Sequence, residues 1–231
     1  MVGGSMTNVA ILRRVPFLAI LPEEELAGLG ERMRPRQYRS GTIIFHRDDP
    51  GTTLHIINNG LVKLVLASQE GREVTVSILG PGDFFGELSL LDGGARSASA
   101  VTLEATETLT LDRDPFVAIL ERHPEVANGL LMVLGNRLRR TDELIQDILF
   151  LDLPGRIAKQ LLTLADERGV QTPTGLRIDL RLSQTELASI VGTTRESVNR
   201  CLNAFADRKL LAIDRDAITI RDIEALRERI Y

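Results

Sequence analysis

The chain has 231 residues, 43% of them hydrophobic and 26% charged, which is enough for two modest domains with separate cores. No apolar run approaches the length of a membrane span, and no segment has the layout of a signal peptide. The single cysteine, Cys201, excludes an internal disulfide, and the three histidines are too scattered for a metal site. We therefore expect a cytoplasmic protein without a metal or a membrane partner.

The net charge of −4 is unevenly distributed along the chain. Residues 153–231 contain 13 basic and 11 acidic side chains, a balance of +2, so the remainder carries −6. A nearly neutral segment can still present one basic face to phosphates. The overall acidity therefore does not exclude nucleic acid as a partner.

The N-terminal half changes from a helical to a strand-like pattern. We expect a poorly ordered tail at residues 1–5 and short helices at 12–33, one of them opened by Pro22. Between residues 38 and 112, β-branched and apolar runs recur about every ten residues, separated by turns such as Asn59 with Gly60 and Glu70 with Gly71. This pattern predicts an antiparallel sandwich or barrel. Its strands are expected at 42–45, 54–57, 61–65, 74–78, 99–102 and 107–111.

A heptad pattern marks the helical region at residues 114–150. Its apolar seam follows spacings of four and three residues and consists of Ala127, Leu131, Leu134, Leu138, Thr141, Ile145 and Ile148. So narrow a stripe favours a parallel dimer coil, with one amphipathic helix packed on its own barrel as the alternative. The polar Thr141 is an exception on this seam. The residues LDLPG at 151–155 then break the helix and form the best domain boundary.

The segment beyond the boundary contains two helices around a tight turn. We expect a helix at 156–167, a turn-rich stretch at 169–175, a strand pair around 176–182, a hairpin at 212–220 and a closing helix. Within LSQTELASIVGTTRESVNRCLNAFADRKLL, Ser183 and Glu186 form a capping box, Gly192 supplies the turn, and Thr194 can cap the second helix. This arrangement predicts a helix-turn-helix.

Polar side chains at the start of the second helix are suited to DNA. Arginine pairs with guanine, glutamate accepts from cytosine, and hydroxyl groups bind phosphates. The alternative is a plain helical hairpin with a solvated charged face, which explains the cap and turn less well. The predicted DNA contacts are Ser183, Gln184, Thr194, Arg195, Glu196, Ser197, Asn199 and Arg200.

The segment FGELSLLDGGARSASAV, residues 85–101, has the chemistry of a nucleotide site. Arg96 and Ser97 offer a cationic fork and a hydroxyl to a phosphate. Glu87 can accept a hydrogen bond from a sugar hydroxyl, and Gly86 allows close backbone approach. The alternative is a surface Glu–Arg pair in an ordinary loop.

This segment resembles the phosphate-binding cassette of cyclic-nucleotide-binding domains. With RLRRTDELIQDILFLDLPGRIAKQLLTLA and TRESVNR, it makes the chain from Ile11 onward similar to the cyclic AMP receptor proteins of the CRP/FNR family of bacterial transcription regulators. The resemblance implies an α+β fold with an N-terminal antiparallel β-roll (a cyclic-nucleotide-binding jelly roll), a long dimerisation helix and a C-terminal winged helix-turn-helix. The implied domains are residues 1–123, 124–152 and 153–231.

The resemblance also implies a role for each site residue toward cyclic AMP as allosteric effector. Glu87 would take the ribose 2′-hydroxyl, and Arg96 and Ser97 the cyclic phosphate. Thr141 would contact the adenine, joined by Asp142 of the partner subunit. The implied ligand-binding set is Gly86, Glu87, Leu88, Arg96, Ser97, Arg137, Thr141 and Asp142.

The sequence departs from the family pattern at two places. Asp142 stands where members often carry serine or asparagine; it either faces the adenine amino group or turns outward to Arg139. The cysteines of the oxygen-sensing branch are absent, which makes Cys201 a small helix residue rather than a sensor.

The leading hypothesis is a cyclic AMP-responsive homodimer that binds palindromic double-stranded DNA and meets RNA polymerase. The alternative is a CRP/FNR-type regulator that responds to a different nucleotide or binds DNA without an effector. The sequence contains no nucleophile–base set, GxSxG motif or Walker loop, so we do not expect an enzyme or catalytic residues.

Overall fold

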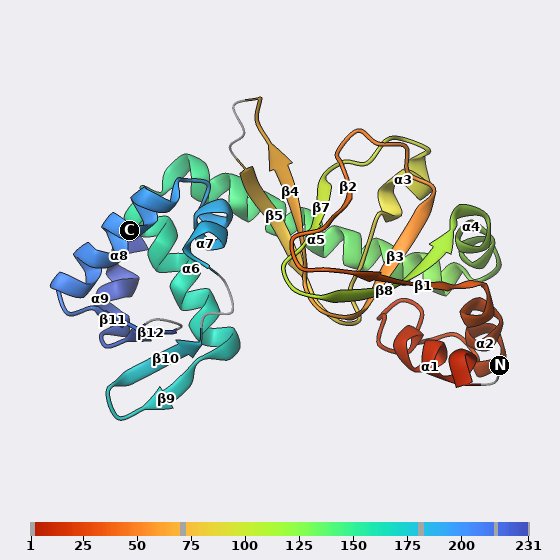
Figure 1. Cartoon of the computed structure of the whole chain (residues 1–231), viewed down its shortest axis with the longest axis horizontal. Coiled ribbons are helices and arrows are strands. Elements are labelled where there is room, and N and C mark those ends of the chain that lie inside the picture. The colour runs from red at the N-terminus through yellow and green to blue at the C-terminus, as the bar shows by residue number, and fades with distance from the viewer. Residues whose placement is uncertain (1–2, 70–72, 180–182, 215–216, 231) are drawn as a thin grey trace. The chain divides into compact units, whose positions relative to one another are not determined.

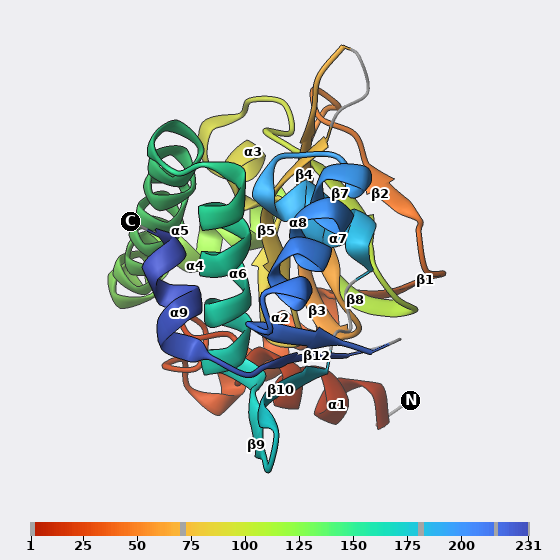
Figure 2. The same ribbon diagram turned by 90° about the vertical axis from the view of Figure 1, so that its left-hand side faces the viewer.

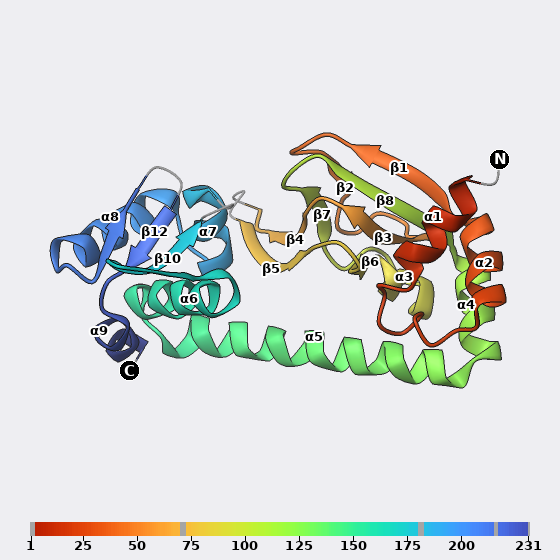
Figure 3. The same ribbon diagram turned by 90° about the horizontal axis from the view of Figure 1, so that it is seen from below.

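The computed structural model describes residues 3–69, 73–179, 183–214 and 217–230 (Figure 1). Contacts divide them into two compact units. The first contains the chain up to Leu66 together with Val76–Arg140, and the second contains the described parts of Ala67–Thr75 and Thr141–Tyr231. The division falls inside helix α5 (Pro124–Phe150), a continuous helix of 27 residues (Figure 3). Among the described residues, no helix is both long and apolar enough to cross a membrane.

The first unit is an antiparallel roll built from two four-stranded sheets (Figure 1). One sheet has the order β1-β8-β3-β6, from β1 (Arg34–Tyr38), β8 (Thr106–Asp112), β3 (Thr53–Asn59) and β6 (Phe84–Phe85). The other has the order β2-β7-β4-β5, from β2 (Ile43–Phe45), β7 (Ser99–Thr102), β4 (Val62–Ala67) and β5 (Glu73–Leu79). These strands confirm the predicted β-roll.

Strand β3 contributes to two different cores. Because successive side chains of a strand point to opposite faces, Leu54 and Ile56 join the core beneath the helices, whereas Ile57 joins a smaller core inside the roll. β8 is paired with β3 in a register that places Leu54 opposite Leu111. The alternate side chains of the strand, on its other face, therefore point into the roll interior.

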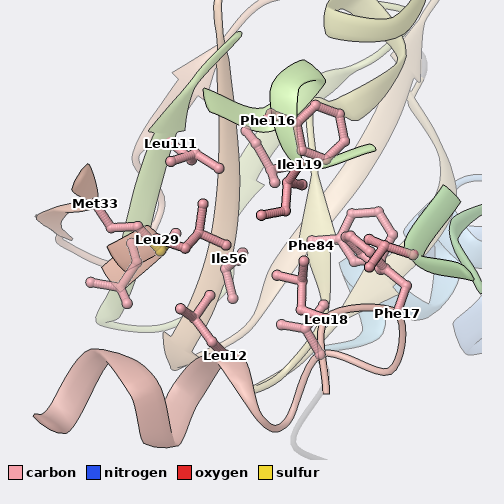
Figure 4. Packing of buried hydrophobic residues seen from close by; sticks show 14 of the residues in the cluster. Leu12, Phe17, Leu18, Leu29, Met33, Ile56, Phe84, Leu111, Phe116 and Ile119 are labelled. Carbon is pink, nitrogen blue, oxygen red and sulfur yellow. The ribbon is translucent and has the colours of Figure 1, made fainter. Parts of the chain in front are cut away.

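Helices cover the outer face of the first sheet. They are α1 (Gly3–Leu12), α2 (Glu23–Arg32), α4 (Arg113–Arg122) and the first turns of α5. Figure 4 shows their core, in which Leu12, Phe17 and Phe116 pack toward Ile56. Phe17 meets the ring of Phe84 edge to face, with centroids 4.8 Å apart. This packing fixes β6, and with it the residues that follow Phe85.

The second unit contains the predicted winged helix-turn-helix (Figure 2). Its sheet has the order β11-β12-β10-β9 and packs with the helices around a core that includes Leu161, Val198 and Phe205. The elements are α6 (Leu153–Arg168), β9 (Val170–Thr172), β10 (Gly175–Asp179), α7 (Gln184–Val191), α8 (Arg195–Asp207), β11 (Leu211–Ile213), β12 (Ala217–Ile220), α9 (Ile223–Arg227) and a 3₁₀ turn at Glu228–Ile230.

Several local expectations are wrong. Helix α1 begins at Gly3, within the expected tail, and β1 precedes the expected strand region. Residues 87–92 form helix α3 (Glu87–Asp92), for which no helix was predicted, and β9 lies in a stretch interpreted as turns. The expected turn at Glu70 and Gly71 lies outside the described residues, as does Leu182 at the end of the expected strand pair.

Candidate functional site

Helix α3 places the carboxylate of Glu87 inside the roll. Its caps, Gly86 with φ 84° and Gly93 with φ 72°, are both left-handed, a conformation that suits glycine. Glu87 is only 4% exposed. Arg137 of α5 donates from Nη1 to Glu87 Oε1 at 2.9 Å and from Nη2 to the Phe84 carbonyl at 2.6 Å. The charge of the buried carboxylate is therefore offset by an arginine from the long helix.

Arg96 is the second buried charge of the site, at 4% exposure. It donates from Nη1 to the Gly86 carbonyl at 2.7 Å and from Nη2 to the Thr53 carbonyl at 2.8 Å. Its Cζ atom lies 4.2 Å from the centroid of the Phe45 ring. Its Nε atom is buried and has no hydrogen-bond partner among the described residues. The guanidinium therefore retains one donor for another acceptor.

Burial lowers the pKa of Arg96, while the charges of Glu87 and Asp49 raise it. The two carboxylates thus favour the charged form of the guanidinium, whereas burial alone disfavours that charged form. Because the ordinary pKa of arginine is so high, the side chain stays positive at neutral pH. The roll consequently holds a buried cation, Arg96, and a buried carboxylate, Glu87.

Two glycines let the guanidinium lie against the backbone. A Cβ atom at Gly86 would clash with Arg96 Nη1. A Cβ atom at Gly51 would lie 2.5 Å from Ser89 Cβ and 2.9 Å from Arg96 Nε. Neither position has room for a side chain while Arg96 keeps its place. Of the two, only Gly86 was predicted from the sequence.

The remaining predicted ligand residues lie next to Arg96 and Glu87 in the chain or on α5. Ser97 is exposed directly after Arg96, and Leu88 is 40% exposed on α3. Thr141, half-buried, follows Arg137 by one helical turn, so both lie on the same face of α5. Asp142 is exposed. Arg139 donates to Asn136 Oδ1 at 2.5 Å, so the described side chains do not form the alternative pairing of Asp142 with Arg139.

Sequence reasoning missed four buried or half-buried residues beside these charges, three of which contact the arginines directly. Thr53 supplies carbonyl and hydroxyl acceptors to Arg96, and Phe45 and Phe84 lie under the two arginines. His55, the fourth, stacks on Phe85 inside the roll. These contacts join separate strands, and the alternating pattern of β3 was the only sequence signal that could have placed Thr53 and His55 on the inner face.

The second candidate site is the exposed start of α8. Ser183 caps α7 in the predicted capping box, and Gly192 ends α7 in the left-handed conformation. Thr194 caps α8 by accepting from the Ser197 amide at 3.3 Å. These caps confirm the helix-turn-helix that the sequence predicted.

The side chains expected to read DNA lie on the free face of α8. Arg195, Glu196 and Arg200 are exposed, and Asn199 is half-buried. The pKa of Glu196 is lowered, first by a hydrogen bond to its own backbone and then by one from Thr194, so its carboxylate stays ionised as an acceptor. Arg200 Nη2 donates to Ser197 Oγ at 3.2 Å. In the described residues, no group of His, Cys, Asp or Glu side chains could hold a metal ion.

Comparison with known proteins identifies the family of each domain. Residues 35–123 match the cyclic nucleotide-binding domain family, and residues 155–229 match the Crp-like helix-turn-helix domain family. A CRP-like cAMP-activated global transcriptional regulator of Mycobacterium tuberculosis is 38% identical over 95% of this chain and 98% of its own length. The Cyclic AMP receptor protein of Thermus thermophilus is 37% identical over 92% of this chain and 94% of its own length. The chain belongs to the CRP/FNR family.

This CRP/FNR regulator also shares its fold with relatives of known structure. The c-di-GMP responsive global regulator CLP of Xanthomonas campestris has a TM-score of 0.74 and 25% identity, over 82% of this chain and 94% of its own. The relatives are transcription regulators rather than enzymes. The pocket around Glu87 and Arg96 thus lies in a nucleotide-binding domain, and α8 in a DNA-binding domain.

Proposed function

We propose that this chain is a cyclic AMP-responsive transcription regulator that binds palindromic DNA as a homodimer. The observation that carries the proposal is the pair of buried opposite charges, Glu87 and Arg96, in one roll. A buried charge needs a partner, and Arg96 has an unused donor at Nε. A cyclic phosphate at Arg96 and a ribose hydroxyl at Glu87 satisfy both groups at once.

The pocket is held ready by contacts that a nucleotide would replace or share. Arg137 donates to Glu87 Oε1, which leaves Oε2 to accept a ribose 2′-hydroxyl. Ser97, exposed beside Arg96, can donate its hydroxyl to the phosphate, and the backbone of Gly86 and Leu88 lies next to Glu87. On α5, Thr141 would contact the adenine. Asp142 of the partner subunit would accept from the 6-amino group and so disfavour guanine.

The homodimer is supported by the apolar seam of α5. Leu131 is 64% exposed, Leu138 63% and Ile145 50%, and they recur every seven residues. Single exposed leucines are ordinary, but a heptad row of them on a continuous helix is the pattern of a parallel coil. Leu131 and Leu138 are exposed beside the half-buried Leu134, which packs against the core of the first unit. The alternative, a helix that uses this row only against its own roll, fits these exposed leucines poorly.

DNA reading is assigned to the start of α8. Arg195 and Arg200 would pair with guanines and Glu196 with a cytosine, with Asn199 beside them. Ser183, Gln184, Thr194 and Ser197 would bind backbone phosphates and fix the register. A dimer places two such helices in half-sites about 34 Å apart, and the family resemblance implies half-sites like TGTGA with an inverted partner. RNA polymerase would be a further partner, in the cytoplasm.

The test combines two measurements on the full chain. Calorimetry with cyclic AMP, cyclic GMP and cyclic di-GMP identifies the effector, and a mobility shift on a palindromic probe with and without that effector shows the response. We expect cyclic AMP to bind most tightly and to strengthen DNA binding. Tighter binding of another nucleotide, or equal DNA binding with and without effector, would favour the alternative regulator.

A further inference from the structure

The imidazole of His55 lies inside the roll, close to the arginine that would bind the phosphate. His55 is on β3 and only 5% exposed. Its ring stacks on Phe85, with centroids 4.9 Å apart and planes inclined by 13°. The ring of Phe45 is shared: it lies 5.8 Å from the His55 ring and carries the Arg96 guanidinium at 4.2 Å. The roles described above leave this buried imidazole unexplained.

Thr53 connects the two side chains through its hydroxyl group. Arg96 Nη2 donates to Thr53 Oγ1 at 3.3 Å, and the same oxygen lies 3.3 Å from His55 Nε2. Because a guanidinium has donors only, the threonine oxygen must be the acceptor in the first contact. The hydroxyl hydrogen then remains for the second contact. It can be donated to His55 only where Nε2 carries no proton.

The surroundings of His55 keep its ring neutral. Burial lowers its pKa to about 3, with smaller contributions from the positive charges of Arg96 and Arg36. A neutral imidazole carries one N–H, which lies on Nδ1 when Nε2 is the acceptor. Nδ1 is buried and has no hydrogen-bond partner among the described residues. In this tautomer the ring keeps an N–H without a described partner at Nδ1, while Nε2 lies within hydrogen-bond distance of Thr53 Oγ1.

We propose that His55 is a positioning residue for Arg96: it accepts the Thr53 hydroxyl hydrogen and so turns the threonine lone pairs toward the guanidinium. Arg96 is thereby held by three acceptors of its own domain, Gly86 and the two Thr53 oxygens, with Nε left for the ligand. The inference rests on the proposed function, because the role of Arg96 is to bind a nucleotide phosphate. His55 itself does not contact the ligand.

Two substitutions at His55 separate hydrogen bonding from packing. His55→Phe keeps an aromatic ring on Phe85 but removes the acceptor, whereas His55→Gln keeps an acceptor near the place of Nε2 but removes the ring. We expect His55→Phe to weaken cyclic AMP binding about three- to tenfold, the worth of one hydrogen bond, and His55→Gln to bind within about twofold of wild type. If His55 only packs, the order is reversed. That reversed order in calorimetry, with both variants folded by circular dichroism, would overturn the proposal.

A double-mutant cycle tests whether the effect passes through Thr53. Thr53→Val removes the hydroxyl and keeps the shape of the side chain. We expect Thr53→Val to weaken binding as His55→Phe does, and the double variant to be no weaker than Thr53→Val alone. Losses that multiply in the double variant would mean that the two residues act independently, and the proposed chain would be wrong.

A measurement without nucleotide keeps this inference separable from the proposed function. Nitrogen-15 shifts of the His55 ring, assigned by comparison with His55→Phe, report which nitrogen carries the proton. We expect a neutral ring with the proton on Nδ1 at pH 7. A proton on Nε2, or a doubly protonated ring, would refute the proposal even where cyclic AMP binds. The expected tautomer in a protein that binds no nucleotide would support the hydrogen-bond chain and count against the proposed function alone.

Discussion

Arg96 combines a high cost of burial with an incomplete set of partners. Its guanidinium is almost fully covered, and two backbone carbonyls, the Thr53 hydroxyl and one aromatic ring contact it. The charges of Glu87 and Asp49 favour its charged form, but the hydrogen bonds of the guanidinium within the described part of the chain go to neutral oxygens, which carry only partial charge. Under the proposed function, the nucleotide phosphate would supply the full anionic partner that these contacts lack.

Replacing this arginine should abolish tight nucleotide binding. We expect Arg96→Leu to cost about 2–5 kcal/mol of cyclic AMP binding, because the phosphate loses its charge-assisted partner in a buried site. The roll should still fold, because the substitution removes a buried charge. Calorimetry measures the affinity, and Arg47→Leu, an exposed arginine that pairs with Asp48, is the matched control. Equal affinity of Arg96→Leu and wild type would show that the phosphate binds elsewhere.

Cys201 has the properties of a packing residue. It is buried on α8, and burial raises its pKa to about 11, with a smaller contribution from the charge of Asp152. Only the thiolate reacts with alkylating agents, and at pH 8 a thiol with this pKa is almost entirely protonated. We expect iodoacetamide to modify native Cys201 about a hundredfold more slowly than the urea-unfolded chain. A native rate close to the unfolded one would reopen a role for Cys201 as a sensor.

At the scale of elements, helix α8 begins at a cap encoded in the local sequence, and its exposed face carries the side chains proposed to read DNA bases. Its start is set by Thr194, and its buried face by residues such as Val198 and Leu202. The opposite face carries Arg195 and Arg200 toward solvent. A helix that is anchored on one side and positively charged on the other can enter a major groove without rearrangement.

Removing a base-reading arginine should relax specificity at one base pair. We expect Arg195→Ala to cost about 1–3 kcal/mol on the preferred half-site and to reduce the difference between bases at a single position. Arg208→Ala, at the other end of the same helix, removes the same charge and should leave base preference unchanged. Mobility shifts on a set of single-base half-site variants measure both effects. If wild type and Arg195→Ala show the same base preferences, Arg195 does not read a base.

Local sequence signals predicted some elements, whereas long-range contacts determined the others. The capping box of Ser183 with Glu186 and the αL position of Gly192 depend on residues within one turn, so the sequence was sufficient there. Strand β1 was missed because RPRQY is almost wholly exposed and polar, and β6 because it has two residues. The Thr53 carbonyl that holds Arg96 lies 43 residues away in the chain. No local pattern reports such a partner.

At the scale of the whole molecule, α5 would connect the proposed ligand binding with the proposed assembly. Arg137, which holds Glu87, and Leu138, which belongs to the seam, are neighbours on one helix. An effector can change DNA binding only by favouring one arrangement of the dimer over another. A single helix that carries both Arg137 and the proposed interface would be a direct physical connection between the two events.

Placing a charge on the seam should separate the subunits. We expect Leu138→Glu to convert the dimer to a monomer at micromolar concentration, because two buried like charges would face each other across a parallel coil. Met132→Glu makes the same chemical change at a position of α5 outside the seam that is 72% exposed, and should leave the dimer intact. Analytical ultracentrifugation distinguishes the two states. A dimeric Leu138→Glu protein would place the interface on another surface.

The carbonyl contacts of Arg96 affect which anions this side chain can bind tightly. The Gly86 and Thr53 carbonyls already accept from the Nη atoms of Arg96, so an anion that displaces neither of them gains only the Nε donor. Sulfate, which is abundant in cells, has no proton to donate to the carboxylate of Glu87 and is repelled by its charge. A nucleotide brings a sugar hydroxyl to that carboxylate together with its phosphate. Under the proposed function, the site would therefore require a phosphate and a sugar hydroxyl together, and sulfate should not activate the protein.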